Sequence, residues 1–258
     1  MHFLRGVEDN LSFINQIFLI VQNESEVPSY VNKNNVKIIL HKDFIPQEYL
    51  PTFNSNTIET FLYRIEGLSE HFIYSNDDMF ALNPLTVQNF FPTESTAITN
   101  FSHFYPGRRE LSFFLNTVVK NNAIIFKKSE QEIRERKGAF QPIHTMRPYF
   151  KSLYQECYES NMKEVEKGIT RFRAPFNYSL YMVDLYQLQL GRTIVEEPFA
   201  HQNIMNNISD VELQKILQED CYNTICIIDH FPEVDIFENI LLQNFFKQKF
   251  YKKSKYEV

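Results

Sequence analysis

Two adjacent carboxylates, Asp77 and Asp78, follow a short apolar run and could hold a divalent cation. The stretch reads EHFIYSNDDMF over residues 70–80, so the carboxylates stand where a buried strand is expected to end. Ionised carboxylates at such a place are costly unless a cation or hydrogen-bond donors offset their charge. Hard oxygen ligands suit Mg²⁺ or Mn²⁺, and such an ion keeps positions open for substrate phosphates. The pair therefore indicates a metal-dependent phosphate site.

The same residues also favour a tight turn, and the two interpretations stay open on this stretch alone. Asn76, Asp77 and Asp78 are residue types that readily accept bends in the backbone. In open α/β sheets, ligands bind beyond the carboxyl ends of the strands, which is where this turn would lie. The surrounding sequence must therefore decide between a plain turn and a metal site.

The composition limits how phosphate could be bound. The chain has 258 residues, 43% of them hydrophobic, which is enough for one large core or two small ones. Only six glycines occur, and neither GxGxxG nor GxxxxGK[ST] is present, so a phosphate site must rely on a cation and side chains. The net charge is −6, and basic residues form no long run except KQKFYKKSK at 247–255. No nucleic-acid partner is therefore expected.

The cysteines and the hydropathy pattern favour a cytoplasmic protein. Cys157, Cys221 and Cys226 are an odd number without a CxxC pair. Neither a disulfide framework nor a cysteine zinc site is expected, and all three cysteines read as small core residues. No stretch of about 18 apolar residues predicts a membrane-spanning helix, and charges from Arg5 onward argue against a signal peptide. The C-terminal lysines leave open a peripheral contact with an anionic membrane surface or polymer, and the oligomeric state is not predicted.

The periodicity of apolar residues predicts an α/β fold. Apolar runs at 14–23, 35–43 and 70–76 have the length and the branched residues of buried strands. The segment 55–65 has apolar positions at helical spacing, with Ser55 as its expected N-cap. Strands that alternate with a helix in this way predict a layered fold with a mostly parallel sheet.

The second half of the chain is predicted to be mainly helical. Helices are expected at 146–168, 177–191 and 235–250, and a buried strand at 222–229. No internal repeat or linker divides the sequence, so we expect a single domain over residues 1–258. Its expected parts are an α/β half, a mainly helical insertion, and a C-terminal strand and helix, at 1–105, 106–222 and 223–258.

Residues 50–80 resemble the second conserved region of the Stealth family. They read LPTFNSNTIETFLYRIEGLSEHFIYSNDD up to Asp78. The family pattern there is roughly LPTF-N/S-S-x-x-I-E, followed by R-I-x-G-L-S-x-x-F-I-Y-x-N-D-D. Stealth proteins are sugar-1-phosphate transferases that build bacterial capsules, and the lysosomal-enzyme N-acetylglucosamine-1-phosphotransferase of animals belongs with them. A match along the whole of this stretch favours the metal site over a plain turn.

The resemblance continues downstream of this region. Residues 140–153 and 171–192 are similar to the third conserved region, ICIID at 225–229 to the fourth region's Cys-Ile-Asn-Asp, and KFYKKSKYE at 249–257 to the family's Phe-Pro-x-Lys-Ser-x-Phe-Glu ending. The family's first conserved region, a strand with a Tyr-Thr-Trp-Val-like motif, has no counterpart in the sequence. We therefore expect either that the chain is truncated or that this strand is dispensable.

The resemblance implies both a reaction and a fold. Family members move a hexose 1-phosphate, here expected to be N-acetylhexosamine 1-phosphate, from a UDP-activated hexose to a hydroxyl of an oligosaccharide or polysaccharide. UMP leaves and a phosphodiester forms. The implied fold is a GT-A-like nucleotide-sugar transferase sheet flanked by helices, with a helical insertion. Two alternatives stay open: a metal-dependent GT-A glycosyltransferase that releases UDP, and an inactive module that lacks the first strand.

Five positions take catalytic or metal-binding roles from the resemblance. Asp77 and Asp78 would hold Mg²⁺ or Mn²⁺ on the diphosphate. Arg173 would neutralise the transferred phosphoryl group, since guanidinium matches phosphate oxygens in a bidentate way. His144 would take the acceptor's proton, and Asp229 would orient His144 or complete the metal shell. Phosphoryl transfer needs a cation, a positive side chain and a base around one phosphorus, so His144 and Arg173 are expected to converge on the two aspartates.

Four further positions could contact the substrate, and each has a structural alternative. Asn54 and Ser55 either cap a helix or belong to a helix start whose amides bind the substrate. Glu59, one turn after Ser55, could face the same cleft. Arg147 could share a helical face with His144, or it could lie on the surface.

Overall fold

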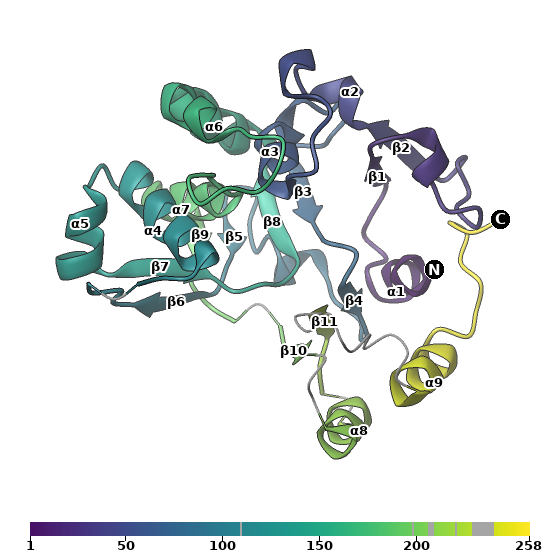
Figure 1. Cartoon of the computed structure of the whole chain (residues 1–258). Coiled ribbons are helices and arrows are strands. Elements are labelled where there is room, and N and C mark those ends of the chain that lie inside the picture. Colours follow the sequence, from purple (N-terminus) through teal and green to yellow (C-terminus); the bar gives the residue numbers. More distant parts are fainter. Residues whose placement is uncertain (109, 198, 206–208, 220, 229–239) are drawn as a thin grey trace.

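The computed structural model describes residues 1–108, 110–197, 199–205, 209–219, 221–228 and 240–258, which form a mixed α/β fold (Figure 1). The helices are α1 (His2–Asn10), α2 (His41–Phe44), α3 (Ser55–Thr60), α4 (Phe113–Ile125), α5 (Glu130–Glu132), α6 (Lys151–Val165), α7 (Tyr181–Gln189), α8 (Asp210–Gln218) and α9 (Ile240–Lys249). The strands are β1 (Ile17–Val21), β2 (Val36–Leu40), β3 (His71–Tyr74), β4 (Met79–Ala81), β5 (Ala97–Ile98), β6 (Phe101–Phe104), β7 (Ala139–Pro142), β8 (Arg147–Phe150), β9 (Thr193–Ile194), β10 (His201–Met205) and β11 (Thr224–Ile228).

The strands form several small ladders instead of one long sheet. β1 pairs with β2 and β5 with β9 in parallel, whereas β3 pairs with β8 and β6 with β7 in antiparallel fashion. β11 lies between β10, which is parallel to it, and β4, which is antiparallel. Three of the six pairings between described strands are therefore antiparallel, and the expectation of a mostly parallel sheet is wrong. The order of elements along the chain does not reveal that β3 pairs with β8, which comes from far downstream.

Strand β8 also corrects the helix expected at 146–168. Residues Arg147–Phe150 are extended, and helix α6 begins only at Lys151. Pro148 explains the difference, because proline has no N–H for a helical hydrogen bond and favours extended backbone in the residue before it. The segment therefore contains a strand–helix boundary where the periodicity indicates a helix alone.

The other expected elements lie where the periodicity places them, with shorter bounds. Strands β1, β2, β3 and β11 lie inside the four apolar runs, and α7 lies inside 177–191. Helix α3 covers only the first part of 55–65, and a 3₁₀ turn follows at Leu62–Arg64. Helix α9 belongs to the helix expected at 235–250, whose first residues, 235–239, lie outside the described part of the chain.

Alternate side chains of β4 and β11 pack into two different cores. Met79 and Cys226 belong to one core, together with apolar residues of α1 and of the β1–β2 pair. Phe80 and Ile225 belong to the other core, which α8 and α9 complete. Because successive side chains of a strand point to opposite faces, this short ladder is buried on both sides. The turn that precedes β4 is therefore attached to a rigid support.

The largest core lies between the β3–β8 pair and the helices α4, α6 and α7 (Figure 1). It is rich in tyrosine, and Tyr149 and Tyr154 are fully buried. Buried phenol groups need hydrogen-bond partners. The Tyr149 hydroxyl donates to Asp184 Oδ2 at 2.9 Å, and the Tyr154 hydroxyl donates to the Glu59 carbonyl at 2.7 Å. This core holds β8 in place, and with it the loop that leads into β8.

The N- and C-terminal segments lie side by side (Figure 1). Arg5 of α1 donates through Nε and Nη2 to the two carboxylate oxygens of Glu257, at 2.7 and 2.8 Å. The Val258 N–H donates to the Tyr30 carbonyl at 3.0 Å. The C-terminal segment is therefore fastened to the first helix by a bidentate ion pair.

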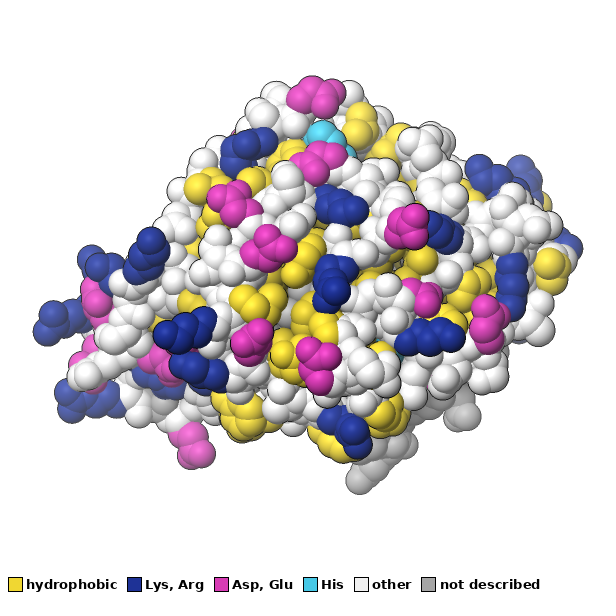
Figure 2. All heavy atoms as spheres, turned by 90° about the horizontal axis from the view of Figure 1, so that it is seen from above, with side chains coloured by type: hydrophobic (Ala, Val, Ile, Leu, Met, Phe, Trp, Pro, Cys, Tyr) yellow, Lys and Arg dark blue, Asp and Glu magenta, His cyan; other side chains and the backbone are white. Residues whose placement is uncertain are grey.

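One face of the molecule, seen from above the view of Figure 1, carries charges of both signs (Figure 2). Lysine and arginine side chains alternate with acidic ones over it, and apolar side chains show between them. This face therefore presents no field of a single sign. Among the helices that the structure describes, none combines the length and the apolar composition that crossing a bilayer requires.

Candidate active site

Asp77 and Asp78 lie in the turn between β3 and β4 (Figure 1). The Met79 N–H donates to the Asn76 carbonyl at 3.4 Å, so the turn that the sequence favours is present. The Ile227 N–H of β11 donates to the Asp78 carbonyl at 2.9 Å and extends the β4–β11 ladder by one bond. Asp77 is exposed, whereas Asp78 is half-buried. The Asp78 backbone is therefore fixed, and its side chain is partly withdrawn from water.

The pairing of β3 with β8 brings His144 to Asp78. Tyr74, the last residue of β3, is opposite Arg147, the first residue of β8. Because the two strands are antiparallel, the residues that follow β3 lie beside those that precede β8. His144 Nε2 lies 3.7 Å from Asp78 Oδ2. The structure thus joins two side chains that come from distant segments of the chain.

Cys226 completes a cluster with Asp78 and His144. In the β4–β11 ladder Cys226 is opposite Met79, the residue after Asp78. One oxygen of Asp78, a ring nitrogen of His144 and the Cys226 sulfur lie within 4.8 Å of one another, and we call these three side chains the mixed-donor cluster. Burial raises the pKa of the Cys226 thiol well above its usual range, and the charge of Asp78 acts in the same direction. Asp229, which the sequence adds to this site, lies outside the described residues.

One atom of the mixed-donor cluster lacks a partner. Asp78 Oδ1 is buried and accepts no hydrogen bond among the described residues. A buried carboxylate oxygen that has lost water without a replacement costs free energy, so such atoms normally have a donor or a cation. A divalent cation would supply the missing partner, and carboxylate oxygen is a ligand that Mg²⁺ and Mn²⁺ prefer. The environment of Asp78, with Asp77 beside it, therefore fits the cation that the sequence predicts.

A further acidic group, Glu59 of α3, lies close to the end of β3. The Tyr74 hydroxyl donates to Glu59 Oε1 at 3.0 Å. Burial raises the pKa of Glu59 to about 7, although the positive charges of Arg147 and Arg173 act in the opposite direction. Burial also raises the pKa of Tyr74, and the charge of Asp78 contributes to that rise. Tyr74 is therefore bonded to Glu59, and Glu59 can hold or release a proton near neutral pH.

Arg173 lies on the Glu59 side of the site. Its Nη2 donates to Ser55 Oγ at 2.7 Å, and its side chain is exposed. Its positive charge opposes the rise that burial causes in the pKa of Glu59. No hydrogen bond or ion pair between described residues joins Arg173 to Asp78. The structure therefore brings Arg173 to Glu59 and Ser55, and it brings His144 to Asp78.

Asn54 caps helix α3, a place that the sequence assigns to Ser55. Asn54 has extended backbone angles, and its side chain accepts an N–H of the first helical turn at 3.1 Å. Ser55 is already helical, whereas a cap is supplied by the residue before the first turn, so Ser55 as the cap is wrong by one position and the alternative role of Asn54 as a cap is confirmed. The Asn54 amide also donates to the carbonyls of Thr170 and Phe172, at 3.2 and 3.4 Å. Asn54 thereby fixes the segment that leads to Arg173 against the start of α3.

Arg147 neither shares a helical face with His144 nor lies on the surface. It is buried in β8, where its Nη1 donates to Asp184 Oδ2 at 3.0 Å, and we call this contact the buried ion pair. The guanidinium also lies over the Tyr181 ring, 4.1 Å from its centroid. Burial raises the pKa of Asp184, whereas Arg147 and the Tyr149 hydroxyl act in the opposite direction. Both expected positions of Arg147, on a helical face and on the surface, are wrong because the segment expected to be a helix is a buried strand.

The remaining donors of Arg147 hold the loop that carries His144. Nη2 of Arg147 donates to the carbonyl of Ile143, and Nε donates to the carbonyl of Thr145. These two residues stand on either side of His144. Arg147 is therefore a positioning residue, which fixes the backbone around His144 without reaching Asp78.

Two residues near the site, His201 and Cys226, were not predicted as site residues from the sequence. His201 of β10 pairs through Nδ1 with Thr224 Oγ1 at 2.7 Å. Burial lowers the pKa of His201, and the backbone of His144 is among the groups that act on it. Cys226 looks like an ordinary core residue, because a thiol is a small apolar group. Its place as the cysteine of the ICIID motif is the signal in the sequence that points to the site, although the motif assigns the cysteine no role.

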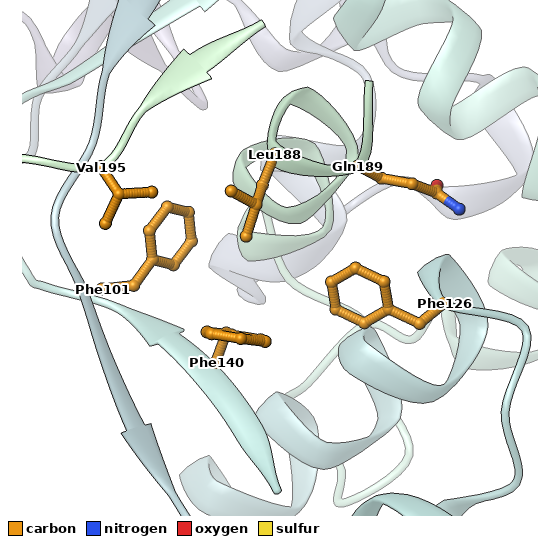
Figure 3. Close-up of a pocket in the computed structure, with 6 residues that line it drawn as sticks. All are labelled: Phe101, Phe126, Phe140, Leu188, Gln189 and Val195. Carbon is orange, nitrogen blue, oxygen red and sulfur yellow. The ribbon is translucent and has the colours of Figure 1, made fainter. Parts of the chain in front are cut away.

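An apolar cavity of about 330 Å³ lies next to β6 and β7 (Figure 3). Its lining is Phe101, Phe126, Phe140, Leu188, Gln189 and Val195. Strand β7 continues from Phe140 to Pro142 and then into the loop of His144, so the cavity and the mixed-donor cluster share one segment. A lining of this kind offers phosphate neither a positive charge nor several donors. The cavity is therefore not where a donor diphosphate would bind.

Known proteins resemble this chain both in one region and over most of its length. Residues 1–99 match the family model of Stealth protein CR2, conserved region 2. The receptor polysaccharide phosphotransferase WefC of Streptococcus oralis is 26% identical, over 95% of this chain and 81% of that protein. The capsular polysaccharide phosphotransferase LcbA of Neisseria meningitidis is 27% identical, over 95% of this chain and 70% of that protein.

A third relative is similar over a smaller share of its own length. The capsular polysaccharide phosphotransferase fcs1 of Haemophilus influenzae is 28% identical, over 84% of this chain and 61% of that protein. The region matched by the family model contains Asn54, Ser55, Glu59, Asp77 and Asp78. The chain is therefore similar to Stealth proteins in this conserved region, and to polysaccharide phosphotransferases over most of its length.

Proposed function

We propose that this chain transfers a hexose 1-phosphate from a UDP-activated hexose to a saccharide hydroxyl, in the synthesis of a capsular or surface polysaccharide. The donor that we favour is a UDP-N-acetylhexosamine. The observation that carries the proposal is the 3.7 Å approach of His144 Nε2 to Asp78 Oδ2. A base beside a carboxylate that can bind a cation is what phosphoryl transfer to a hydroxyl requires. The names of the relatives, which are polysaccharide phosphotransferases, support the same class of reaction.

The proposed reaction breaks one phosphorus–oxygen bond and forms another. The oxygen of the acceptor hydroxyl bonds to the β-phosphorus, and the bond from this phosphorus to the bridging oxygen breaks. The bridging oxygen leaves with UMP, while the sugar keeps its bond to the β-phosphate. His144 Nε2 accepts the proton of the hydroxyl, and Asp78 stabilises the imidazolium that forms. A phosphodiester and UMP are therefore the products.

Asp77 and Asp78 would hold Mg²⁺ or Mn²⁺. Bound there, the ion would supply positive charge for the diphosphate oxygens. The buried Asp78 Oδ1, which has no donor among the described residues, supports this assignment. The bond from the Ile227 N–H to the Asp78 carbonyl fixes the turn before any ligand binds. A ligand that is already ordered loses less entropy on binding than a mobile one.

Arg173 would neutralise the phosphoryl group as it is transferred. A guanidinium has five N–H donors, and Ser55 Oγ accepts from one of the Arg173 nitrogens. The backbone beside Arg173 is fixed, because the Phe53 N–H donates to the Arg171 carbonyl at 2.8 Å and Asn54 holds neighbouring carbonyls. An exposed guanidinium on a fixed backbone can close on a phosphate without reordering the loop.

We further propose a cytoplasmic location with a weak peripheral contact to an anionic surface. Lys252, Lys253 and Lys255 are exposed near the C-terminus. Each lysine close to an anionic membrane contributes about 1 kcal/mol of attraction. Such a contact would weaken as salt is added, and co-sedimentation with vesicles that contain phosphatidylserine would measure it.

The products of one incubation test the proposed reaction. The chain is supplied with UDP-N-acetylhexosamine, Mg²⁺ and a short capsule oligosaccharide, and the mixture is followed by phosphorus NMR and nucleotide chromatography. We expect a new phosphodiester signal, with UMP released one for one. Release of UDP without a phosphodiester would replace the proposal by ordinary glycosyl transfer. Failure to bind the nucleotide sugar in the presence of Mg²⁺ would identify the chain as an inactive module.

A further inference from the structure

The mixed-donor cluster differs in its chemistry from an ordinary magnesium site. Asp78 offers an oxygen, His144 a nitrogen and Cys226 a sulfur, all within 4.8 Å of one another. Magnesium sites are built from oxygen ligands, whereas imidazole and thiolate are typical ligands of zinc. The three side chains therefore form a donor set that suits a softer ion than the one that Asp77 and Asp78 would hold.

The spacing of the cluster is close to that of a zinc shell. Ligands that bind Zn²⁺ at its usual distances and at tetrahedral angles lie roughly 3.3–3.8 Å apart. The His144 Nε2 and Asp78 Oδ2 atoms are 3.7 Å apart, a few tenths of an ångström more than the roughly 3.3 Å expected for a nitrogen and an oxygen on one Zn²⁺. All three donor atoms lie within 4.8 Å of one another, so the side chains must approach one another further before one ion contacts all three.

A second observation points to a ligand at this place. Asp78 Oδ1 is buried without a hydrogen-bond partner among the described residues, and Cys226 is fully buried. Both residues are held by the β4–β11 ladder, and Arg147 holds the loop of His144 through the carbonyls beside it. The backbone that carries the donors is thus fixed, while one donor atom has no partner among the described residues. The side chains of His144 and Asp78 are 34% and 29% exposed, so an ion could enter from solvent.

We propose that Asp78, His144 and Cys226 bind one Zn²⁺, with a fourth position open to solvent, and that this ion inhibits the transferase. The inhibitory role rests on the proposed function. Zn²⁺ binding would release the thiol proton to solvent and occupy the lone pair of His144 Nε2. It would also take Asp78 from the magnesium ion. The base and the cation site would be lost together, and they would return when a chelator removes the zinc.

Cobalt provides a readout of the site that does not depend on turnover. Co²⁺ occupies zinc sites, and a thiolate ligand gives it a charge-transfer band in the near ultraviolet. We expect one Co²⁺ per chain with this band, and one equivalent of Zn²⁺ should remove it. Cys226→Ser should lose the band and bind Zn²⁺ more weakly by over about 100-fold. Cys157→Ser and Cys221→Ser are matched controls, because they remove the other two thiols and should keep the band.

Two results with the Cys226→Ser variant would overturn the zinc site. The first is a Co²⁺ charge-transfer band that is unchanged from the wild type. The second is a Zn²⁺ affinity equal to that of the wild type. Cys226 is buried, so its replacement could disturb folding. His144→Ala lies in a partly exposed loop and provides the second test. It should lower Zn²⁺ affinity as strongly, and wild-type affinity in His144→Ala would overturn the site as well.

Turnover then tests the inhibitory role separately. In Mg²⁺ buffer, one equivalent of Zn²⁺ should lower UMP release by at least about tenfold, and chelation followed by fresh Mg²⁺ should restore it. Unchanged or faster release with Zn²⁺ bound would overturn the inhibitory role. A chain that is inactive with every donor would reject the proposed function, and the cobalt band would still decide the metal site. An active chain without the band would reject the zinc site alone.

Discussion

His144 of the mixed-donor cluster and Arg147 of the buried ion pair lie on the same short segment, yet the two carboxylate pairs that they form differ in distance and exposure. In the buried pair, Arg147 Nη1 and Asp184 Oδ2 are 3.0 Å apart, and the side chains are 3% and 0% exposed. In the cluster, His144 Nε2 and Asp78 Oδ2 are 3.7 Å apart, and the side chains are 34% and 29% exposed. In each pair one carboxylate oxygen, Asp184 Oδ1 or Asp78 Oδ1, is buried without a hydrogen-bond partner among the described residues, so the two pairs differ in distance and exposure. We call Arg147–Asp184 the closed pair and His144–Asp78 the open pair.

The difference shows which charges stabilise the fold and which are free for chemistry. A buried pair with short contacts cannot exchange its partners for a substrate without a large cost in free energy. An open pair can, because solvent and ligands already reach it. The two are connected, since Arg147 also donates to the carbonyls on either side of His144. The closed pair therefore positions one member of the open pair.

The largest effect should come from the open pair, through His144→Gln. Removing the base should lower the rate of UMP release by about 10²- to 10⁴-fold. The free energy of unfolding should stay within about 0.5 kcal/mol, because the side chain is partly exposed. Steady-state kinetics and urea unfolding measure the two quantities. A variant with wild-type turnover would remove His144 from the mechanism.

The closed pair should respond in the opposite way in Arg147→Met. Removing one member leaves Asp184 buried without its cation, which should lower the free energy of unfolding by about 3–5 kcal/mol. Arg173→Met is the matched control, because its guanidinium is exposed. It should change stability by less than about 0.5 kcal/mol and slow the transfer instead. Equal loss of stability in both variants would contradict the distinction between closed and open charges.

Glu59 accepts a hydrogen bond from Tyr74, which is opposite Arg147 in the β3–β8 ladder, and it extends the comparison to pH. Its folded pKa, about 7, is raised above the ordinary value by burial, so the folded state binds its proton more tightly than the unfolded state. This contribution to stability is full below pH 4.5 and is lost as pH rises through 7, by about 3 kcal/mol at most.

Glu59→Gln tests that contribution directly. Its urea midpoint should vary less between pH 4.5 and 7 than that of the wild type, since glutamine cannot ionise but can still accept from Tyr74. Identical pH profiles for the two proteins would mean that Glu59 does not carry the raised pKa.

A smaller effect is expected at Arg5 and Glu257, a pair outside both clusters. The hydrogen bond from Arg5 lowers the pKa of Glu257 to about 2. Its contribution is therefore present above pH 4.5 and is lost as pH falls through 2. Glu257→Gln should lower stability by about 2 kcal/mol at pH 7 and by much less near pH 2. A constant difference at all pH values would show that packing, and not charge, joins the termini.

The sequence predicts most of the elements but not their pairing. Short apolar runs mark the strands at 17–21, 36–40 and 71–74, because a buried strand needs only a few apolar residues in a row. The partner of β3 is invisible to periodicity, since β8 lies far downstream and its Pro148 interrupts a pattern that otherwise indicates a helix. The antiparallel pairing, and with it the placement of the site, could not be derived from spacing.

The sequence likewise indicates some residues of the site and not others. Asp78 and His144 lie in stretches that resemble conserved regions of one family, so this resemblance can assign both residues to one site. Arg147 and Asp184 have the same residue types as a surface pair, and only the structure shows that they are buried. Cys226 reads as an apolar core residue, because its distance from Asp78 depends on the ladder of β4 and β11.

The same substitution placed in both pairs tests the central distinction most directly. Turnover and the free energy of unfolding are measured together for Asp78→Asn and Asp184→Asn. Asp78→Asn should abolish turnover and leave stability within about 1 kcal/mol of the wild type, because the carboxylate that it removes is 29% exposed and has no short ion pair. Asp184→Asn should lose about 3 kcal/mol of stability and, where it is folded, keep turnover within about tenfold. Full activity in Asp78→Asn, or loss of turnover without loss of stability in Asp184→Asn, would contradict this account.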